Sequence, residues 1–204
     1  MTRQLSAYLS LLFMLTGCSS TGQIPEDRFY QLQTHVSATP VLPKAVLSGS
    51  LRVDYVMADP LRSGRAVLYR DMRKPLELHR YHYEFWVDQP PRMIHQALLN
   101  YLRSSGIAGT IQGDSRHADT DYRLETRLLR FERVVGDGAP KVELELEATL
   151  YSERTRSAMW TAVYLQQQES DGKDMHASTR AMQKALEHVL ESLLADLAAV
   201  EAKT

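Results

Sequence analysis

The chain carries two kinds of hydrophobic periodicity, one typical of strands and one typical of helices. Residues 141–152 alternate strictly, with apolar side chains at Val142, Leu144 and Leu146 separated by glutamates. A period of two predicts a strand that buries one face. Weaker alternation, bounded by Gly, Pro and Asp, predicts further strands. These cover residues 28–32, 51–57, 65–69, 76–87, 107–111, 121–135 and 159–168.

Two segments have apolar side chains three and four positions apart, which predicts amphipathic helices. The first begins at Pro90-Pro91, because proline suits the first turn of a helix, where its missing N–H would have no partner. It is expected to end near Gly106, in the position of a C-cap glycine. The second covers about residues 174–201, with an apolar stripe that runs from Ala181 to Leu197.

The order of these elements predicts the fold class. The turn Gly136-Asp137-Gly138-Ala139-Pro140 joins the two longest strand segments, so we expect them to form an antiparallel hairpin. The whole pattern predicts an α+β fold, with a mostly antiparallel sheet and two main helices packed on one face. Residues 33–50 are rich in Pro, Gly, Ser and Thr and are expected to be an extended linker. Glu143, Glu145 and Glu147 are expected on a solvated strand face.

The N-terminus has the layout of an export signal. Arg3 precedes a short apolar run from Ala7 to Leu15, and the run ends at Leu15-Thr16-Gly17-Cys18. An apolar run of about nine residues is too short to span a bilayer, which needs about 20. The tetrapeptide resembles the lipobox of bacterial lipoproteins. The resemblance implies cleavage before Cys18 and lipidation of that residue; an ordinary signal peptide, or an anchor helix with an incidental cysteine, is the alternative.

This hypothesis divides the chain into three parts. Residues 1–17 are the lipoprotein signal peptide, residues 18–27 the lipidated N-terminus and a flexible tether, and residues 28–204 the folded domain. Covalent acyl chains such as palmitate would anchor Cys18, because each buried methylene contributes about 0.8 kcal/mol. Ser19, rather than aspartate, follows the cysteine. By resemblance to lipoprotein sorting, Ser19 favours the inner leaflet of the outer membrane, with the domain facing the periplasm.

Composition excludes several classes of function. Without residues 1–17, which contain only Arg3 as a charged side chain, the chain has 23 basic and 25 acidic residues, a net charge of −2. Nucleic-acid binding therefore has no electrostatic support. Cys18 is the only cysteine. Once it is acylated no thiol remains, so thiol catalysis and thiolate metal sites are excluded.

The motifs of common enzymes are missing from the sequence. It has no Gly-x-Ser-x-Gly elbow, no His-Glu-x-x-His and no P-loop. His79 and His82 are the closest pair of histidines, but residues three apart on a strand point to opposite faces and do not converge on one metal ion. We therefore expect a protein that is not an enzyme and that has no cofactor or metal, apart from the covalent lipid on Cys18.

Several motifs together resemble one lipoprotein family. They are Phe29-Tyr30-Gln31-Leu32, Leu51-Arg52-Val53, Trp86 with Pro90-Pro91, Ala97-Leu98 with Leu102 and Gly106, Asp121-Tyr122-Arg123-Leu124-Glu125, Leu128 with Phe131, and Ala185-Leu186 with Val189-Leu190. In this order, after a lipobox, they resemble the ABC-type transport auxiliary lipoprotein component family, the PqiC/YmbA-like proteins. The resemblance assigns Trp86, Pro90, Asp121, Tyr122 and Phe131 a structural or interface role and no catalytic one.

The resemblance implies a function in the cell envelope. Such lipoproteins accompany an ABC permease, an ATPase and a protein with MCE (mammalian cell entry) domains, in systems that move lipids or organic solvents. The expected role is to dock the periplasmic MCE protein at the outer membrane, with a homo-oligomer possible. The alternative is a lipid- or solute-binding lipoprotein that carries cargo itself, which needs an apolar pocket of about 300 Å³ or more.

Overall fold

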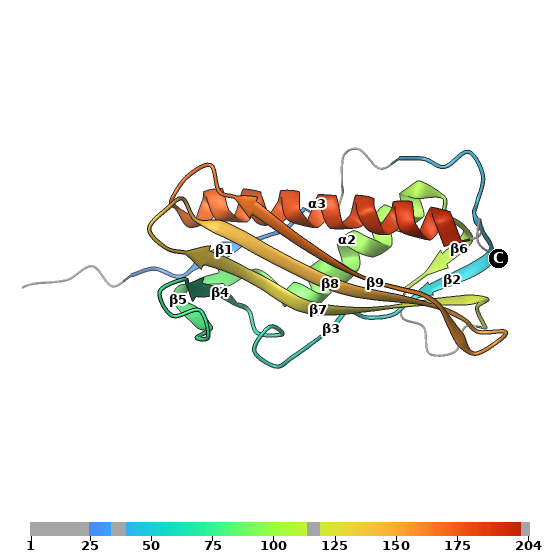
Figure 1. Ribbon diagram of the computed structural model, residues 1–204, viewed down its shortest axis with the longest axis horizontal. Coiled ribbons are helices and arrows are strands. Elements are labelled where there is room, and N and C mark those ends of the chain that lie inside the picture. Colours follow the sequence, from blue (N-terminus) through green and yellow to red (C-terminus); the bar gives the residue numbers. More distant parts are fainter. Residues whose placement is uncertain (1–24, 34–39, 114–118, 201–204) are drawn as a thin grey trace, which may run out of the picture.

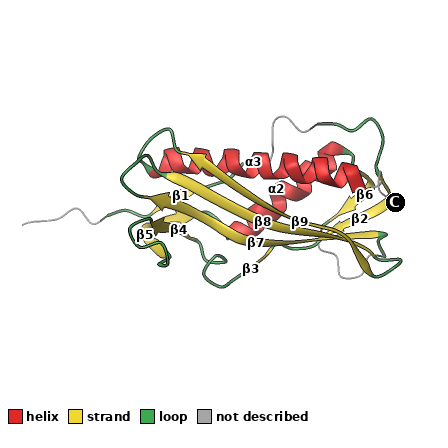
Figure 2. Ribbon diagram, in the orientation of Figure 1, coloured by secondary structure: helices red, strands yellow, loops and turns green. Residues whose placement is uncertain are grey.

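The computed structural model describes residues 25–33, 40–113 and 119–200. The signal peptide, Cys18 and the first part of the tether lie outside the described residues. The described chain forms one nine-stranded sheet and two helices (Figure 2). The strands are β1 (Arg28–Tyr30), β2 (Leu47–Val53), β3 (Met57–Ala58), β4 (Ala66–Asp71), β5 (His79–Trp86), β6 (Ala108–Gln112), β7 (Tyr122–Val135), β8 (Lys141–Ser152) and β9 (Ser157–Glu169). The helices are α2 (Pro90–Ser105) and α3 (Met175–Val200).

Strand β7 is the centre of the sheet. One of its edges pairs with β8 along almost its whole length, and β8 pairs with β9. Its other edge is divided among β2, β3 and β4, which pair with successive parts of β7. Beyond them the sheet forks, because β2 pairs with β6 at one end and β4 pairs with β5 and then β1 at the other. β9 is thus the long outer strand of the sheet.

The expectation of a mostly antiparallel sheet is wrong. Five strand pairings are parallel and three are antiparallel. The antiparallel pairs join strands that follow one another through short turns, as the β7–β8 hairpin does. The parallel pairs need crossovers, and α2 lies in the crossover that brings β6 and β7 beside β2. The sheet is therefore mixed.

Both expected helices are present, and both bury their apolar stripes against the sheet. α2 begins at Pro90 and ends before Gly106, which has a φ of 69° in the left-handed region that glycine adopts without cost. In Figure 1, α2 lies behind the long strands, and α3 runs along β8 and β9. No helix among the described residues is long and apolar enough to cross a membrane.

A bulge in β7 explains how two apolar residues three positions apart are both buried. Leu128 pairs with Leu146 and Phe131 pairs with Leu144, so Leu129 is the extra residue between them. In a regular strand, residues three apart point to opposite faces. The bulge restores both side chains to the helix-covered face, where Leu128 and Phe131 are almost fully buried.

A close contact ties β2 to the start of β7. The carboxylate of Asp121 accepts hydrogen bonds from the Ser50 backbone N–H at 2.7 Å and from the Ser50 hydroxyl at 2.8 Å. These bonds hold the pKa of Asp121 below its usual value. Gly49 precedes them with a φ of +124°, and a Cβ atom there would lie 2.2 Å from the Asp121 carboxylate. Only glycine suits both the backbone conformation and the space.

Replacing Gly49 by alanine is therefore expected to destabilise the fold. The variant must move Asp121 or Gly49 and also carries a strained φ, at a cost of about 1–3 kcal/mol in the free energy of unfolding. Chemical denaturation of the domain from residue 25 measures this. Gly138→Ala is the matched control, because its added Cβ meets no atom within 4 Å. Equal denaturation midpoints for the two variants would contradict the conclusion that only glycine fits at position 49.

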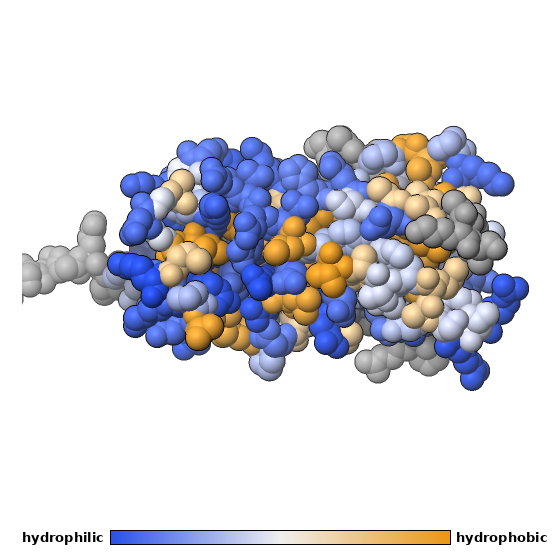
Figure 3. Space-filling model, in the orientation of Figure 1, coloured by the Kyte–Doolittle hydropathy of each residue, from blue (hydrophilic) through white to orange (hydrophobic). Residues whose placement is uncertain are grey.

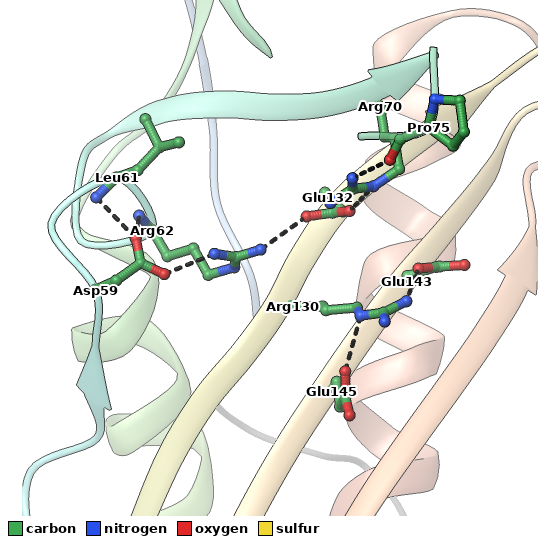
Figure 4. A network of polar contacts seen from close by, with 9 residues as sticks. All are labelled: Asp59, Leu61, Arg62, Arg70, Pro75, Arg130, Glu132, Glu143 and Glu145. Atoms are coloured by element: carbon green, nitrogen blue, oxygen red, sulfur yellow. Dashed lines mark hydrogen bonds and ion pairs between the residues drawn. The ribbon is translucent and has the colours of Figure 1, made fainter. Parts of the chain in front are cut away.

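The sheet face opposite the helices is polar but not simply solvated. Glu132 is fully buried there, between Arg70 Nε at 2.7 Å and Arg62 Nη2 at 3.2 Å (Figure 4). Arg130 bonds Glu143 and Glu145 on the adjacent strand at 2.9 and 2.8 Å. Two of the three glutamates expected to be free in solvent therefore belong to ion pairs. Hydrophilic side chains cover most of the view in Figure 3, with small apolar groups between them.

Candidate functional site

The residues highlighted by sequence do not converge on one site. Cys18 lies outside the described residues. Trp86, at the end of β5, is buried and contacts Phe131 of β7 with a ring-centroid distance of 5.1 Å. Pro90 is buried in the first turn of α2. These three side chains therefore belong to the packing between the sheet and α2.

Asp121 and Tyr122 lie at the other end of β7. Asp121 bonds Ser50, and Tyr122 pairs with Leu51 on one side and Ser152 on the other. Their described contacts connect β2, β7 and β8.

The elongated shape gives the domain two distinct ends (Figure 1). Residues 25–27, the described part of the tether, lead into β1 at the end formed by β1, β4 and β5, which we name the proximal end. The β8–β9 turn and the last turn of α3 lie at the opposite end, which we name the distal end. The tether therefore leaves on the side away from the β8–β9 turn.

The distal end contains a cavity of about 410 Å³. Its lining comes from the β8–β9 turn, the first residues of β9 and the last turn of α3. These residues are Ser152, Arg154, Thr155, Ser157, Ala158, Met159, Trp160, Asp196, Ala199 and Val200. The volume lies in the range of ligand or anchor-residue pockets, about 300–1,000 Å³. We name it the distal cavity.

A second β-bulge shapes the distal cavity. Trp160 pairs with Leu150 and Ala158 pairs with Tyr151, so Met159 is an extra residue in β9. Neighbouring residues of a regular strand point to opposite faces, but a bulge can turn a side chain toward its neighbour's side. Met159 and Trp160 both line the cavity as a result, and both keep part of their surface exposed.

Polar groups hold the walls of the distal cavity in place. The Tyr164 hydroxyl donates a hydrogen bond of 2.7 Å to Asp196, which joins β9 to α3. Burial, and then this bond to a carboxylate, raises the pKa of the Tyr164 phenol well above its usual value. Arg154 and Arg156 are exposed in the turn beside the cavity, and neither forms an ion pair with a described residue. Arg156 has a φ of 55°, a conformation that costs a non-glycine residue energy.

The outer edge of β9 has few of the features that usually protect an edge strand, apart from the bulge at Met159. β9 pairs only with β8 among the described residues, so its second edge is unpaired. Its thirteen residues include no lysine, arginine or proline. On the face away from the helices, Val163 and Leu165 are 52% and 46% exposed. Long exposed edges of this kind are sites where another strand can add.

The distal cavity is lined by side-chain types that are common at protein interfaces. Trp, Met and Arg are the side chains enriched at the centre of protein interfaces, and the distal cavity presents Trp160, Met159 and Arg154 together. The sequence pattern predicts only a strand over Met159–Gln168. The unprotected composition of β9 was the available signal, whereas the bulge and the approach of α3 are tertiary features.

The chain is similar to known proteins in both sequence and fold. A family model described as ABC-type transport auxiliary lipoprotein component matches residues 30–193. No curated protein matches the sequence. The crystal structure of a Xanthomonas campestris protein is similar, with a TM-score of 0.76 and 21% identity, over 86% of this chain and 97% of that one. A hypothetical protein of Chlamydia trachomatis has a TM-score of 0.56 and 10% identity, over 78% and 100% of the two chains. These structures share the fold.

Proposed function

Because the chain belongs to the ABC-type transport auxiliary lipoprotein component family, we propose that it docks a periplasmic MCE-domain protein of an ABC transporter at the outer membrane. The acyl chains on Cys18 hold the proximal end at the inner leaflet, and Ser19 supports this choice of membrane. The transported molecules are lipids or organic solvents. The chain itself performs no catalytic step.

The separation of the two ends of the domain carries this proposal. The tether begins at the proximal end, whereas the distal cavity and the β8–β9 turn lie at the other end of the long axis (Figure 1). A domain held by its proximal end presents the distal end to the periplasm. The partner's contact is therefore expected at the distal cavity, with the free edge of β9 beside it available for strand addition.

Photo-crosslinking in intact cells tests the docking role. A photoreactive residue in place of Thr155, an exposed residue of the β8–β9 turn, is expected to capture the MCE-domain protein. The matched control carries the same group in place of Met72, which is 55% exposed at the proximal end. Capture through Met72 alone would reverse the proposed orientation. Capture of no subunit of the transport system from either position would overturn the docking role.

Trp160→Ala is expected to weaken this capture. A large aromatic side chain at the centre of an interface contributes about 2 kcal/mol or more, so binding should fall by about thirtyfold or more. The yield of crosslinked partner at equal expression measures the effect. Tyr83→Ala is the control, because Tyr83 is an exposed aromatic residue of β5, far along the chain from the cavity. Unchanged capture by Trp160→Ala would exclude the distal cavity as the contact.

One observation favours the alternative that the domain carries cargo. The distal cavity exceeds the minimum volume of a small-ligand pocket. Its lining, however, includes Arg154 and Asp196, which suit a polar group better than an acyl chain. Native mass spectrometry of the protein from envelope extracts distinguishes the two functions. A lipid retained in stoichiometric amount would favour cargo binding.

A further inference from the structure

The turn between β4 and β5 carries an apolar side chain with almost no protein contact. We name residues 72–78 the β4–β5 tip. Leu76 in this tip is 97% exposed, and Met72 is 55% exposed. Single exposed apolar residues are common on protein surfaces, but a large side chain left almost wholly in water at a projecting turn is a candidate contact residue.

Hydrogen bonds fix the β4–β5 tip in this exposed conformation. The Lys74 N–H donates to the Asp71 carbonyl at 2.8 Å, and the Glu77 N–H donates to the Lys74 carbonyl at 3.0 Å. Arg70 bonds the Pro75 carbonyl next to Leu76. The Asp71 carboxylate accepts from both the backbone and the guanidinium of Arg73, which lowers the pKa of Asp71 to about 2. Leu76 is thus presented by an ordered double turn.

The β4–β5 tip lies at the proximal end, where residues 25–27 of the tether lead into β1 (Figure 1). Seven positions separate Cys18 from Pro25. An extended chain spans at most about 3.6 Å per residue, so Pro25 stays within about 25 Å of an acylated Cys18. The proximal end is therefore held close to whatever membrane contains the acyl chains.

We propose that the β4–β5 tip inserts Leu76 and Met72 into the headgroup region of the membrane that anchors Cys18. This inference rests on the lipid anchor of the proposed function and adds a second, non-covalent membrane contact. The inserted side chains fix the rotation of the domain about its tether. The distal cavity then points away from the bilayer.

Charge favours the membrane over an acidic or basic protein as the occupant. The charged side chains from Asp71 to Glu77 are two acids and two bases, and they pair locally as Asp71–Arg73 and Lys74–Glu77. The tip therefore has no net charge to attract a charged partner. Its free surface is apolar, so its binding to a membrane would depend on the apolar area that it buries rather than on charge.

Exposed aromatic side chains at the same end support the inference. Phe29 of β1 is 55% exposed and stacks on Phe85 with a ring-centroid distance of 5.9 Å. Tyr83 of β5 is 44% exposed. The Arg65 guanidinium lies 5.5 Å from the Phe29 ring centroid. Tyrosine and tryptophan rings are enriched at the level of lipid headgroups, which the exposure of Tyr83 fits.

Fluorescence quenching in vesicles tests this contact. The lipidated mature chain carries no free thiol, so Leu76→Cys accepts a single environment-sensitive dye. The protein is reconstituted in phosphatidylethanolamine–phosphatidylglycerol vesicles that contain lipids with a headgroup-level quencher. Val41→Cys is the matched control, because Val41 is 77% exposed and its neighbour Leu42 bonds Ser105 at the end of α2, away from the tip. We expect a blue shift and several-fold stronger quenching at position 76, independent of salt.

The outcomes of this experiment distinguish the membrane contact of the β4–β5 tip from the lipid anchor at Cys18. If the protein floats with the vesicles but the dyes at positions 76 and 41 are quenched equally, the tip does not insert and the inference is overturned, while the anchor stands. If quenching at position 76 disappears at high salt, the contact is electrostatic and the apolar insertion is wrong. If the protein does not float with the vesicles, the lipid anchor fails, and the inference fails with it.

Discussion

Replacing both Arg62 and Arg70 by methionine is expected to lower the free energy of unfolding by about 3–5 kcal/mol. The two arginines are the hydrogen-bonded cations of Glu132, whose side chain is fully buried on the polar face of the sheet. Methionine keeps much of their apolar length but supplies no charge. The variant therefore leaves a carboxylate in a dry site without a partner, which costs far more than the ion pairs contribute when they are intact. Chemical denaturation of the domain measures the loss.

Arg130→Met is the matched control for this double variant. Arg130 also bonds two glutamates, but its own side chain is 43% exposed and Glu143 and Glu145 keep access to water. A partly exposed network of this kind contributes about 1 kcal/mol or less. A third variant, Arg62→Met/Arg70→Met with Glu132→Leu, removes the buried charge as well and should recover much of the lost stability. If the double variant were as stable as Arg130→Met, Glu132 would not depend on its two cations.

Cys18→Ala is expected to release the protein from the envelope almost completely. Each buried methylene of an acyl chain contributes about 0.8 kcal/mol, so the loss of two or three chains exceeds anything that the β4–β5 tip supplies. The described domain begins after the tether and should fold normally in the variant. Fractionation of cells, followed by detection of the protein in soluble and membrane fractions, measures the effect.

Ser20→Ala is the control for the Cys18 variant, since it changes a neighbouring small polar residue and keeps the lipobox cysteine. This control should remain with the outer membrane. Persistence of Cys18→Ala in the membrane fraction after a high-salt wash would show that the chain is held by something other than acyl chains on that residue. The lipoprotein hypothesis for this chain would then be wrong.

Most elements of the fold could be predicted from sequence, although the expected linker at residues 33–50 was wrong at its end, where Leu47 begins β2 and is buried. The parallel pairings of the sheet could not be predicted. Strict alternation over residues 141–152 and the turn at 136–140 correctly predicted the β7–β8 hairpin. Pro90 and Gly106 correctly marked the start and end of α2. The pairing of β2, β3 and β4 with β7 joins residues far apart in the sequence. The hydrophobic pattern of a strand predicts which of its faces is buried, but it does not predict which strand pairs with it.

The distal cavity could not be predicted from the sequence for a related reason. The distal cavity combines a bulge at Met159, a turn with Arg156 in a left-handed conformation, and the last turn of α3. None of these has a distinctive motif, because a bulge adds one residue to an otherwise ordinary strand. The burial of Glu132 was missed as well, since the arginines that enclose it come from two earlier segments of the chain.

The forked sheet has a consequence for the order in which the molecule can fold. β7, β8, β9 and α3 follow one another through the short connections 136–140, 153–156 and 170–174, so their contacts form between near neighbours. β2, by contrast, meets β7 through bonds such as Ser50–Asp121, which close a loop of 71 positions. Local contacts form faster than distant ones. The strands nearest the N-terminus leave the ribosome first, yet β2, β3 and β4 can pair only after β7 has been made.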